Sequence, residues 1–508
     1  MSHRRLLALV LLGSIGFILA FYYNTRFQMR FSAMQPPLNT GPGAIVVGAG
    51  LAGLSAASQL LTQNIPVLLL ERATKPGGNS IKASSGINGA PTRYQSVSDD
   101  AFYADTIRSA GSAIEDMRKS REKLIATLTN ESKESVEWLA DEVGVDLSKV
   151  SQLGGHSIAR THRGSGQTPP GAAIVTTLLK ALQESALFQL KTSCTVTKIL
   201  SSQSRVTGVR YVCNDGTKHE ALGPVIVTSG GFAGDAQGLL SQYRPDLANF
   251  PSTNEPRPGS HALLRDLGAR LIDMGLVQVH PTGFIDPANP SNPLKFLAAE
   301  VLRGEGGLLL MDGKRFVNEL QTRENMTAAI MASAPTSTSP KQWNVQLVLD
   351  EGTYESAKSH VGFYLFKSLM RKCTIADLGA NALDSIRGYA NAAAKGPDHF
   401  HRTSFANWKL MDPRPESVVY VGSVTPVVHF TMGGVMISER AEVLREDEGR
   451  IEGLWAAGEI TGGVHGGNRL GGSSLLECVV FGRRAGNECA EYVLEGKGDK
   501  DEVLHISV

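Results

Sequence analysis

Short apolar runs alternate with a helical pattern near the start of the globular part of the chain. Residues 44–47 are small or β-branched and apolar, and residues 54–61 repeat apolar positions at helical spacing. A second apolar run covers residues 67–70. Continuous apolar runs of this length are typical of buried parallel strands, so the order predicts a β-α-β unit.

Further apolar runs predict strands later in the chain. Residues 196–200 and 206–211 predict a hairpin, and residues 225–232 predict a strand that enters a turn containing Gly230 and Gly231. Residues 451–459 form another run of this kind, and a helical pattern starts at Leu475. Because strands alternate with helices, we expect an α/β protein.

The first 26 residues have a different pattern. Residues 6–23 are apolar and uncharged over 18 positions, follow Arg4 and Arg5, and are closed by polar residues. This length is enough to cross a bilayer, whereas a cleaved signal usually has a shorter apolar core. We therefore expect an uncleaved signal anchor over residues 1–26, with a cleaved signal peptide as the alternative, and a linker over residues 27–43. The location implied is the endoplasmic reticulum, anchored or lumenal, with the mitochondrion as the alternative.

Composition excludes several classes of protein. The 508 residues carry a net charge of +1 with no block of like charges, which argues against a nucleic-acid binder. The five cysteines form no C-x-x-C pair, so we expect buried free thiols and neither a metal site nor a disulfide framework. Glycine is the one excess, with 54 residues gathered in short runs, and this indicates backbone that lies close to a ligand.

The sequence GAGLAG occupies residues 48–53, between the first strand and its helix. In this pattern the first glycine allows a tight turn, the second lets the backbone approach a pyrophosphate, and the third lets the helix pack on the strand. Glu71 ends the second strand 18 residues after Gly53, at a spacing typical of a carboxylate that binds a ribose hydroxyl. We therefore expect the phosphates of a dinucleotide at the helix N-terminus.

Two more segments rich in glycine and serine favour FAD over NAD. One covers residues 75–89 and the other residues 458–474, so they lie near opposite ends of the globular chain and fit one large flavin. The positive end of the helix at Leu475 would stabilise the flavin when reduction makes it negative. The predicted cofactor-binding residues are Gly48, Ala49, Gly50, Ala52, Gly53, Glu71, Arg72, Gly78, Asn79, Ser80, Ser84, Ser85, Gly86, Gly230, Gly231, Glu459, Arg469, Gly472, Ser474 and Leu475.

Several separated motifs carry a resemblance to a known family. They are GGNSIKASSGINGA, QVHPTGF, AAEVLRGEGG, GKRFVNELQTRE, HFTMGG and AAGEITGGVHGGNRLGGSSLLECVVFGR. With GAGLAG, they are similar to motifs of fumarate reductase and succinate dehydrogenase flavoproteins, and more closely to soluble fungal fumarate reductases. The resemblance implies a discontinuous Rossmann-like FAD-binding domain at residues 44–273 and 430–491. It also implies an inserted α+β capping domain at residues 274–429, followed by a tail at residues 492–508.

The resemblance implies reduction of fumarate to succinate, with the hydride delivered by flavin N5. Two substrate carboxylates need cationic or hydrogen-bonding partners. His280, His429 and Arg469 stand in motifs that match the family's substrate clamp, with Gln278 beside them. Arginine suits this task because its planar guanidinium binds a carboxylate through two parallel hydrogen bonds.

The resemblance assigns the proton donor to an arginine, Arg323. Arginine normally keeps its proton, so this role requires that the proton be replaced at once. Glu300 and Arg303 match a relay of carboxylate and guanidinium that hands protons inward. For His156, His162 and Arg163 the sequence leaves open a part in the site or simple packing beside the flavin.

One departure from the membrane-bound members concerns how FAD is attached. Those members carry a histidine that binds FAD covalently, and Asn79 stands at the matching position here. We therefore expect noncovalent FAD, which favours fumarate reduction over succinate oxidation. No iron–sulfur or haem motif is found, so electrons are expected from reduced flavin or another donor.

Other interpretations stay open at this point. One is a related FAD oxidoreductase, such as an aspartate oxidase or a ketosteroid dehydrogenase, and another is a noncatalytic flavoprotein that stores electrons. Asn130 and Asn325 each begin an N-glycosylation sequon. Asn325 lies two residues from Arg323, so we expect it to be inaccessible.

Overall fold

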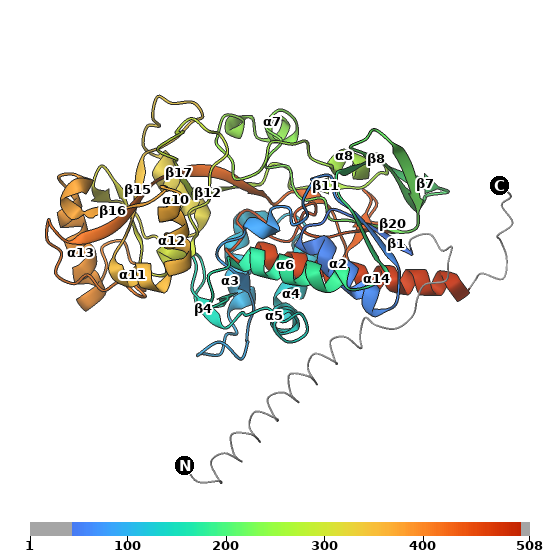
Figure 1. Cartoon of the computed structure of the whole chain (residues 1–508), viewed down its shortest axis with the longest axis horizontal. Coiled ribbons are helices and arrows are strands. Elements are labelled where there is room, and N and C mark those ends of the chain that lie inside the picture. The colour runs from blue at the N-terminus through green and yellow to red at the C-terminus, as the bar shows by residue number, and fades with distance from the viewer. Residues whose placement is uncertain (1–42, 499–508) are drawn as a thin grey trace, which may run out of the picture.

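The computed structural model describes residues 43–498, and Figure 1 shows the path of the chain. The predicted anchor at residues 1–26 and all of the predicted linker except Gly43 lie outside the described residues. Residues 499–508 lie outside them too. Among the described helices, none is both long and apolar enough to cross a membrane.

The larger sheet contains nine strands and has a parallel centre. The order is β6-β2-β1-β10-β20-β8-β7, with β9 beside β8 and β19 beside β20. The strands are β1 (Ala44–Val47), β2 (Val67–Leu70), β6 (Phe188–Lys191), β7 (Cys194–Ser202), β8 (Arg205–Cys213), β9 (Lys218–Leu222), β10 (Val225–Val227), β19 (Glu442–Leu444) and β20 (Arg450–Ala456). The central strands β1, β2 and β10 are buried at every position, as their continuous apolar runs predict. This confirms the β-α-β unit and the hairpin.

Two helices from opposite ends of the chain pack together beside this sheet (Figure 1). They are α2 (Leu51–Thr62) and α14 (Ser473–Gly498). A Cβ atom on Gly482 would lie 2.6 Å from the carbonyl oxygen of Ala52, and one on Gly486 would lie 2.5 Å from that of Ala56. The glycines of α14 therefore let the two backbones approach closely, which holds the two halves of the cofactor-binding sequence together.

Smaller elements surround the larger sheet. A three-stranded sheet joins β3 (Ile87–Asn88), β5 (Thr161–Arg163) and β4 (Lys149–Ser151), and a two-stranded sheet joins β11 (Leu271–Ile272) and β18 (Gly434–Val435). The helices here are α3 (Phe102–Ala110), α4 (Arg118–Asn130), α5 (Ser132–Asp141), α6 (Pro170–Gln183), α7 (Leu239–Tyr243) and α8 (His261–Arg265). The short 3-10 helices of this region are η1 (Ser80–Lys82), η2 (Gly111–Ile114) and η3 (Pro245–Leu247), and a fourth, η4 (Ile375–Leu378), packs with the second sheet described next.

A second sheet has six strands, and all of its pairings are antiparallel. The strands are β12 (Val277–Phe284), β13 (Leu308–Met311), β14 (Lys314–Arg315), β15 (Val345–Leu349), β16 (Arg371–Thr374) and β17 (Val418–Thr431). The helices of this region are α9 (Val301–Gly304), α10 (Arg323–Met331), α11 (Glu351–Ser356), α12 (Lys358–Phe366) and α13 (Ala382–Lys395). The outer elements β16 and α13 lie at the end of the molecule away from β7 and β8 (Figure 1).

Strand β17 runs across the boundary proposed between residues 429 and 430. Its long course carries the chain from the second sheet back toward β18. The division into a cofactor domain and a cap at those boundaries stays a prediction.

One expectation about cysteine is wrong. Cys194 and Cys213 form a disulfide, 19 residues apart in sequence, whereas Cys373, Cys478 and Cys489 are free thiols. The two bonded cysteines are direct partners across the β7–β8 hairpin. Motif spacing could not reveal the bond, because strand register places the two thiols opposite each other.

Candidate active site

A cavity of 610 Å³ lies between the glycine turn after β1, the start of α14 and the loops that approach from the second sheet. Most of the predicted cofactor-binding residues line it. They are Gly48, Gly50, Ala52, Glu71, Arg72, Gly78, Asn79, Ser80, Ser84, Ser85, Gly86, Gly230, Gly231, Glu459, Arg469, Gly472, Ser474 and Leu475. Ala49 and Gly53 lie behind the wall and do not line the cavity.

The glycine turn has the steric requirements expected from its sequence. Gly48 has a φ of +109°, and a Cβ atom there would lie 2.5 Å from the carbonyl oxygen of Thr228. A Cβ atom on Gly53 would lie 2.0 Å from the carbonyl oxygen of Gly48. Any larger residue at either position would therefore push the strand and helix apart. Contact of this turn with a phosphate stays a prediction.

Glu71 is held at the cavity wall by backbone groups. Its carboxylate accepts hydrogen bonds from the amides of Ala49 and Ala73, both at 2.8 Å. Only 6 % of the residue is exposed. The amide of Cys194 donates to the Glu71 carbonyl oxygen at 2.9 Å, so the disulfide-bonded hairpin forms the neighbouring wall.

Unpaired polar atoms at the cavity wall fit a bound nucleotide cofactor. Ser84 Oγ, Ser229 Oγ and Asn79 Oδ1 are buried, and within the described residues they have no hydrogen-bond partner. All three residues line the cavity. Buried polar atoms without partners are costly, so a ligand rich in hydroxyl and phosphate groups would satisfy them. These residues therefore fit FAD.

Gln278 joins the two arginines that face the cavity. Its Oε1 accepts from Arg323 at 2.8 Å and from Arg469 at 3.1 Å, while its amide nitrogen donates to the Arg469 carbonyl oxygen at 2.7 Å. Gln278 comes from β12, Arg323 is the first residue of α10, and Arg469 comes from the loop before α14. The fold thus places two guanidinium groups side by side from segments that are far apart in sequence.

Glu300 and Arg303 lie behind Arg323, away from the cavity wall. Glu300 Oε2 accepts from Arg323 Nε at 2.8 Å, and its other oxygen lies 3.8 Å from Arg303. Burial alone would raise the pKa of the Glu300 carboxyl, but the two guanidinium groups outweigh it and lower that pKa to about 2. Burial lowers the pKa of Arg303 to about 10. Arg323 is therefore hydrogen-bonded to Glu300, whereas Arg303 approaches Glu300 as an ion pair at a separation longer than a hydrogen bond, and a proton relay through the three stays a prediction.

His280 and His429 lie next to each other, with ring centroids 5.3 Å apart. Burial lowers the pKa of both imidazoles well below the usual value, and neighbouring arginines, Arg323 foremost, add to this effect. Both rings are therefore neutral near pH 7 and act as hydrogen-bonding groups rather than cations. His429 lines the cavity, whereas His280 lies behind it with Nε2 4.0 Å from Glu300.

Glu459 is a second buried carboxyl group, separate from the relay. Its Oε1 accepts from the amide of Thr431 at 2.9 Å. Burial, with the nearby charge of Glu477, raises the pKa of Glu459 to about 7. Glu459 is therefore partly protonated at neutral pH. Its carboxyl group can donate a hydrogen bond to a cofactor when protonated and accept one when ionised.

Several residues that support the site had no signal in the sequence. Thr253 shares a 2.9 Å hydrogen bond with Nδ1 of His429, and Asn254 donates to the His429 carbonyl oxygen at 2.9 Å. Asn254 also accepts a hydrogen bond from Asn79, so it links the cofactor loop to the substrate clamp. These residues lie in a polar segment with no periodic pattern.

The expectation that Asn325 is inaccessible is wrong. It lies on the outward face of α10, where its side chain is exposed and donates to Gln321 at 3.0 Å. Arg323, two residues earlier, points inward and is 5 % exposed. Side chains that lie two residues apart on a helix point in different directions.

Comparisons with known proteins agree with this geometry. Residues 43–475 match the family described as FAD binding domain. "Fumarate reductase 1" of Saccharomyces cerevisiae is 45% identical over 472 residues, which cover 88% of this chain and 98% of the yeast protein. "Fumarate reductase" of Schizosaccharomyces pombe is 40% identical over 504 residues, which cover 94% of this chain and 95% of the Schizosaccharomyces pombe protein.

A solved structure supports the same assignment. The open conformation of a flavocytochrome c3 fumarate reductase superposes with a TM-score of 0.69 at 29% identity, over 93% of this chain and 81% of that one. The fold is thus the α/β fold of fumarate reductase flavoproteins, with mixed sheets. The chain binds FAD and belongs to the FAD-dependent fumarate reductases.

Proposed function

We propose that this enzyme reduces fumarate to succinate at the cluster of Arg323, Arg469 and Gln278. The observation that carries the proposal is the charge of the buried site. The guanidinium groups of Arg323 and Arg469 both face the cavity and share Gln278 as a partner, and the Glu300 carboxylate contacts Arg323 from behind. Two guanidinium groups on the cavity wall favour a ligand with two carboxylates, and fumarate is a dianion at neutral pH.

FAD bound in the cavity would, in its reduced state, supply the hydride that adds to one alkene carbon. Its binding residues would be the glycine turn, Glu71, the Asn79–Gly86 segment and the start of α14, all of which line the cavity. The chain's own part is to orient the dicarboxylate. Arg469 would bind one carboxylate, with the neutral ring of His429 on the cavity wall beside it and the ring of His280 packed behind His429.

Arg323 would give the proton to the other alkene carbon. Glu300 rests as a carboxylate, so it can accept a proton from Arg303 and pass it on as Arg323 loses its own. The direct contact between Arg323 and Glu300 makes this replacement a single short transfer. Two electrons and one proton arrive with the hydride and a second proton comes from Arg323, which balances the conversion of fumarate to succinate.

The rival functions predict different results in one experiment. Purified protein that carries FAD is mixed anaerobically with a reduced low-potential dye, with and without fumarate, while the flavin spectrum is followed. A fumarate reductase oxidises the dye only when fumarate is present. An aspartate oxidase or a ketosteroid dehydrogenase would instead have its flavin reduced by its own amino-acid or steroid substrate, which can be added in place of the dye. In a noncatalytic electron reservoir the flavin would be reduced once without turnover, and Arg323→Ala would leave this electron uptake unchanged.

We also propose noncovalent FAD, a diffusible electron donor such as reduced flavin, and a body that faces the lumen of the endoplasmic reticulum. The Cys194–Cys213 disulfide supports the lumenal location, because disulfides persist mainly in oxidising compartments. Asn130 and Asn325 are both exposed and head glycosylation sequons. A lumenal body predicts an endoglycosidase-sensitive mobility shift that the double change Asn130→Gln and Asn325→Gln abolishes. Protease sensitivity of the body in sealed microsomes would contradict this location.

A further inference from the structure

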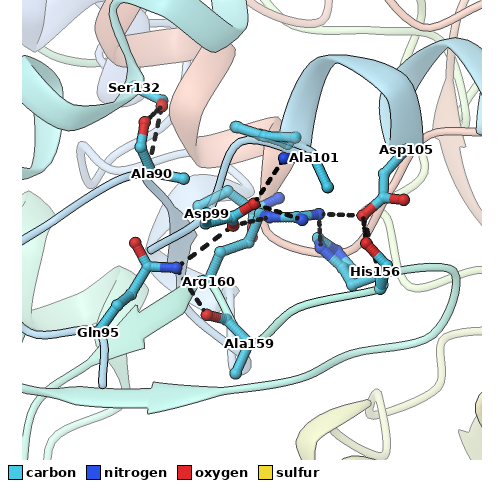
Figure 2. Close-up of polar contacts among 12 residues, drawn as sticks. Ala90, Gln95, Asp99, Ala101, Asp105, Ser132, His156, Ala159 and Arg160 are labelled. Carbon is cyan, nitrogen blue, oxygen red and sulfur yellow. Dashed lines mark hydrogen bonds and ion pairs between the residues drawn. The ribbon is translucent and has the colours of Figure 1, made fainter. Parts of the chain in front are cut away.

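A buried charge network lies beneath the site and has no part in the relay described above. Arg160 is fully buried and donates from Nε to Asp99 at 2.6 Å and from one terminal nitrogen to Asp105 at 2.7 Å. Figure 2 shows both carboxylates converging on this guanidinium group, with His156 beside it. Removing one partner from such a network leaves an uncompensated charge, so its geometry is strongly enforced.

The network determines which ring nitrogen of His156 carries hydrogen. Arg160 points an N–H at Nδ1 of His156 at 3.0 Å, and a guanidinium can only donate (Figure 2). Nδ1 must therefore be the acceptor, and the hydrogen resides on Nε2. Burial and the charge of Arg160 lower the pKa of His156 to about 4, which keeps the ring neutral at physiological pH.

Nε2 of His156 then donates to the carbonyl oxygen of Gly471, at 3.1 Å. The same oxygen accepts from the side-chain amide of Asn88 at 2.8 Å. Two donors from separate segments thus hold one carbonyl in the loop that carries Arg469. Neither donor can reverse its role. His156 is fixed by the N–H of Arg160 at Nδ1, and Asn88 is fixed because its Oδ1 accepts a hydrogen bond from Thr161 at 2.6 Å.

Gly471 packs directly on the acid and its partner. A Cβ atom on Gly471 would lie 2.8 Å from Glu300 Oε2 and 3.2 Å from Arg323. The loop that contains His156 also reaches Glu300 directly, because the amide of Gly154 donates to Oε1 at 3.0 Å. His156 therefore ties together the two backbone segments that enclose the Glu300–Arg323 pair.

We propose that His156 is a positioning residue for proton delivery. Held by Asp99, Asp105 and Arg160, its Nε2–H fixes the Gly471 carbonyl and so keeps Glu300 and Arg323 at the separation that proton transfer needs. This inference rests on the proposed function and extends it beyond the residues that face the cavity. It also assigns a function to a histidine whose role the sequence left open.

Two substitutions separate the two hydrogen bonds of the ring. In His156→Asn the amide oxygen can replace Nδ1 as the acceptor for Arg160, but no donor reaches Gly471. In His156→Gln the longer side chain places its amide nitrogen where Nε2 was, so the donor to Gly471 is kept. As a matched control, His162→Asn alters another buried neutral ring, which contacts Thr92 and the Arg160 carbonyl oxygen and has no contact with Gly471.

With FAD bound and fumarate saturating, His156→Asn should lower kcat roughly 10- to 100-fold, the scale expected for displacement of a catalytic group by a fraction of an ångström to about 1 Å. KM for fumarate should change by less than about threefold, since ground-state binding is retained. The solvent deuterium isotope effect on kcat should rise, because proton delivery becomes limiting. His156→Gln should recover most of kcat, and His162→Asn should leave it unchanged.

Several outcomes would overturn the inference. One is an unchanged kcat and isotope effect in His156→Asn, and another is an equal loss in the Asn and Gln variants. If His156→Asn fails to retain FAD, nitrogen-15 spectra of the wild-type histidines decide: a His156 ring protonated on Nδ1 refutes the proposal, whereas protonation on Nε2 supports it. A wild-type enzyme that ignores fumarate would instead refute the proposed function, so the two failures are distinguishable.

Discussion

Replacement of Arg323 by lysine separates charge from geometry at the proposed acid. In the native protein Nε and one terminal nitrogen of Arg323 face Glu300 Oε2, while the second terminal nitrogen donates to Gln278 at 2.8 Å. Lysine keeps the positive charge but offers a single nitrogen. It can therefore reach Glu300 or Gln278, but not hold both in the arrangement that the guanidinium imposes.

The expected magnitude follows from the loss of a positioned acid. General acid catalysis by a side chain typically contributes about 10²- to 10⁴-fold to the rate, so Arg323→Lys should lower fumarate turnover by at least that factor, or roughly 3–5 kcal/mol in the barrier. The charge next to Glu300 remains, so that carboxyl should keep its lowered pKa and the protein should still fold. The flavin spectrum should be unchanged.

The assay is the fumarate-dependent oxidation of a reduced dye, at saturating fumarate and equal FAD occupancy. Arg315→Lys provides a matched control, because Arg315 also holds a buried carboxylate, that of Glu319, with two nitrogens at 2.9 Å. The control should lose stability and keep its turnover per bound FAD. Undiminished turnover in Arg323→Lys would refute the acid assignment, and an equal loss in Arg315→Lys would mean that the effect is structural.

Three further predictions concern the cofactor and stability. Acid precipitation should leave FAD in the supernatant because Asn79 offers no histidine for a covalent bond, and a yellow pellet would contradict this. Glu459→Gln should stabilise the FAD-free protein by roughly 3 kcal/mol at pH 8 and by almost nothing at pH 4. The reason is that a carboxyl with a raised pKa stabilises the fold only while it is protonated, and this stability is lost as pH rises from 4.5 to about 7. Equal melting-temperature shifts at both pH values would refute this prediction. Replacing Cys194 and Cys213 by serine should lower the free energy of unfolding by about 3 kcal/mol and weaken FAD binding, as measured by denaturant unfolding and flavin fluorescence. Unchanged FAD affinity would show that the disulfide-bonded hairpin does not shape the cavity wall.

Local patterns were enough to predict the part of the fold that binds the dinucleotide. The strands β1 and β2, the helix α2 and the glycine turn between them follow from residues adjacent in sequence, because each needs only apolar spacing and small residues at fixed positions. The β7–β8 hairpin follows for the same reason. The chemistry of Arg323, Glu300 and Arg303 came from the resemblance of whole motifs, since a single arginine carries no such information.

Contacts between distant segments could not be predicted in this way. The Cys194–Cys213 bond depends on strand register, and the link from Asn79 through Asn254 to His429 joins segments about 175 residues apart. The network around Arg160 joins it to Asp99, 61 residues earlier in a loop, and to Asp105, 55 residues earlier in the first turn of α3. Such polar contacts have no periodicity, so only the folded structure reveals them.

The charge balance of the site connects substrate choice with proton transfer. Burial lowers the pKa of Arg469 to about 9 and that of Arg303 to about 10, and Arg323 lies between them. The Glu300 carboxylate contacts Arg323 and lies 3.8 Å from Arg303, while the neutral side chain of Gln278 joins Arg323 to Arg469. In the proposed reaction a bound dicarboxylate would bring negative charge beside Arg469, and Glu300 would keep its interactions with Arg323 and Arg303. In the proposed mechanism the dianion would thus satisfy the clamp while Glu300 stays in contact with Arg323, where it would replace the proton that this arginine gives up.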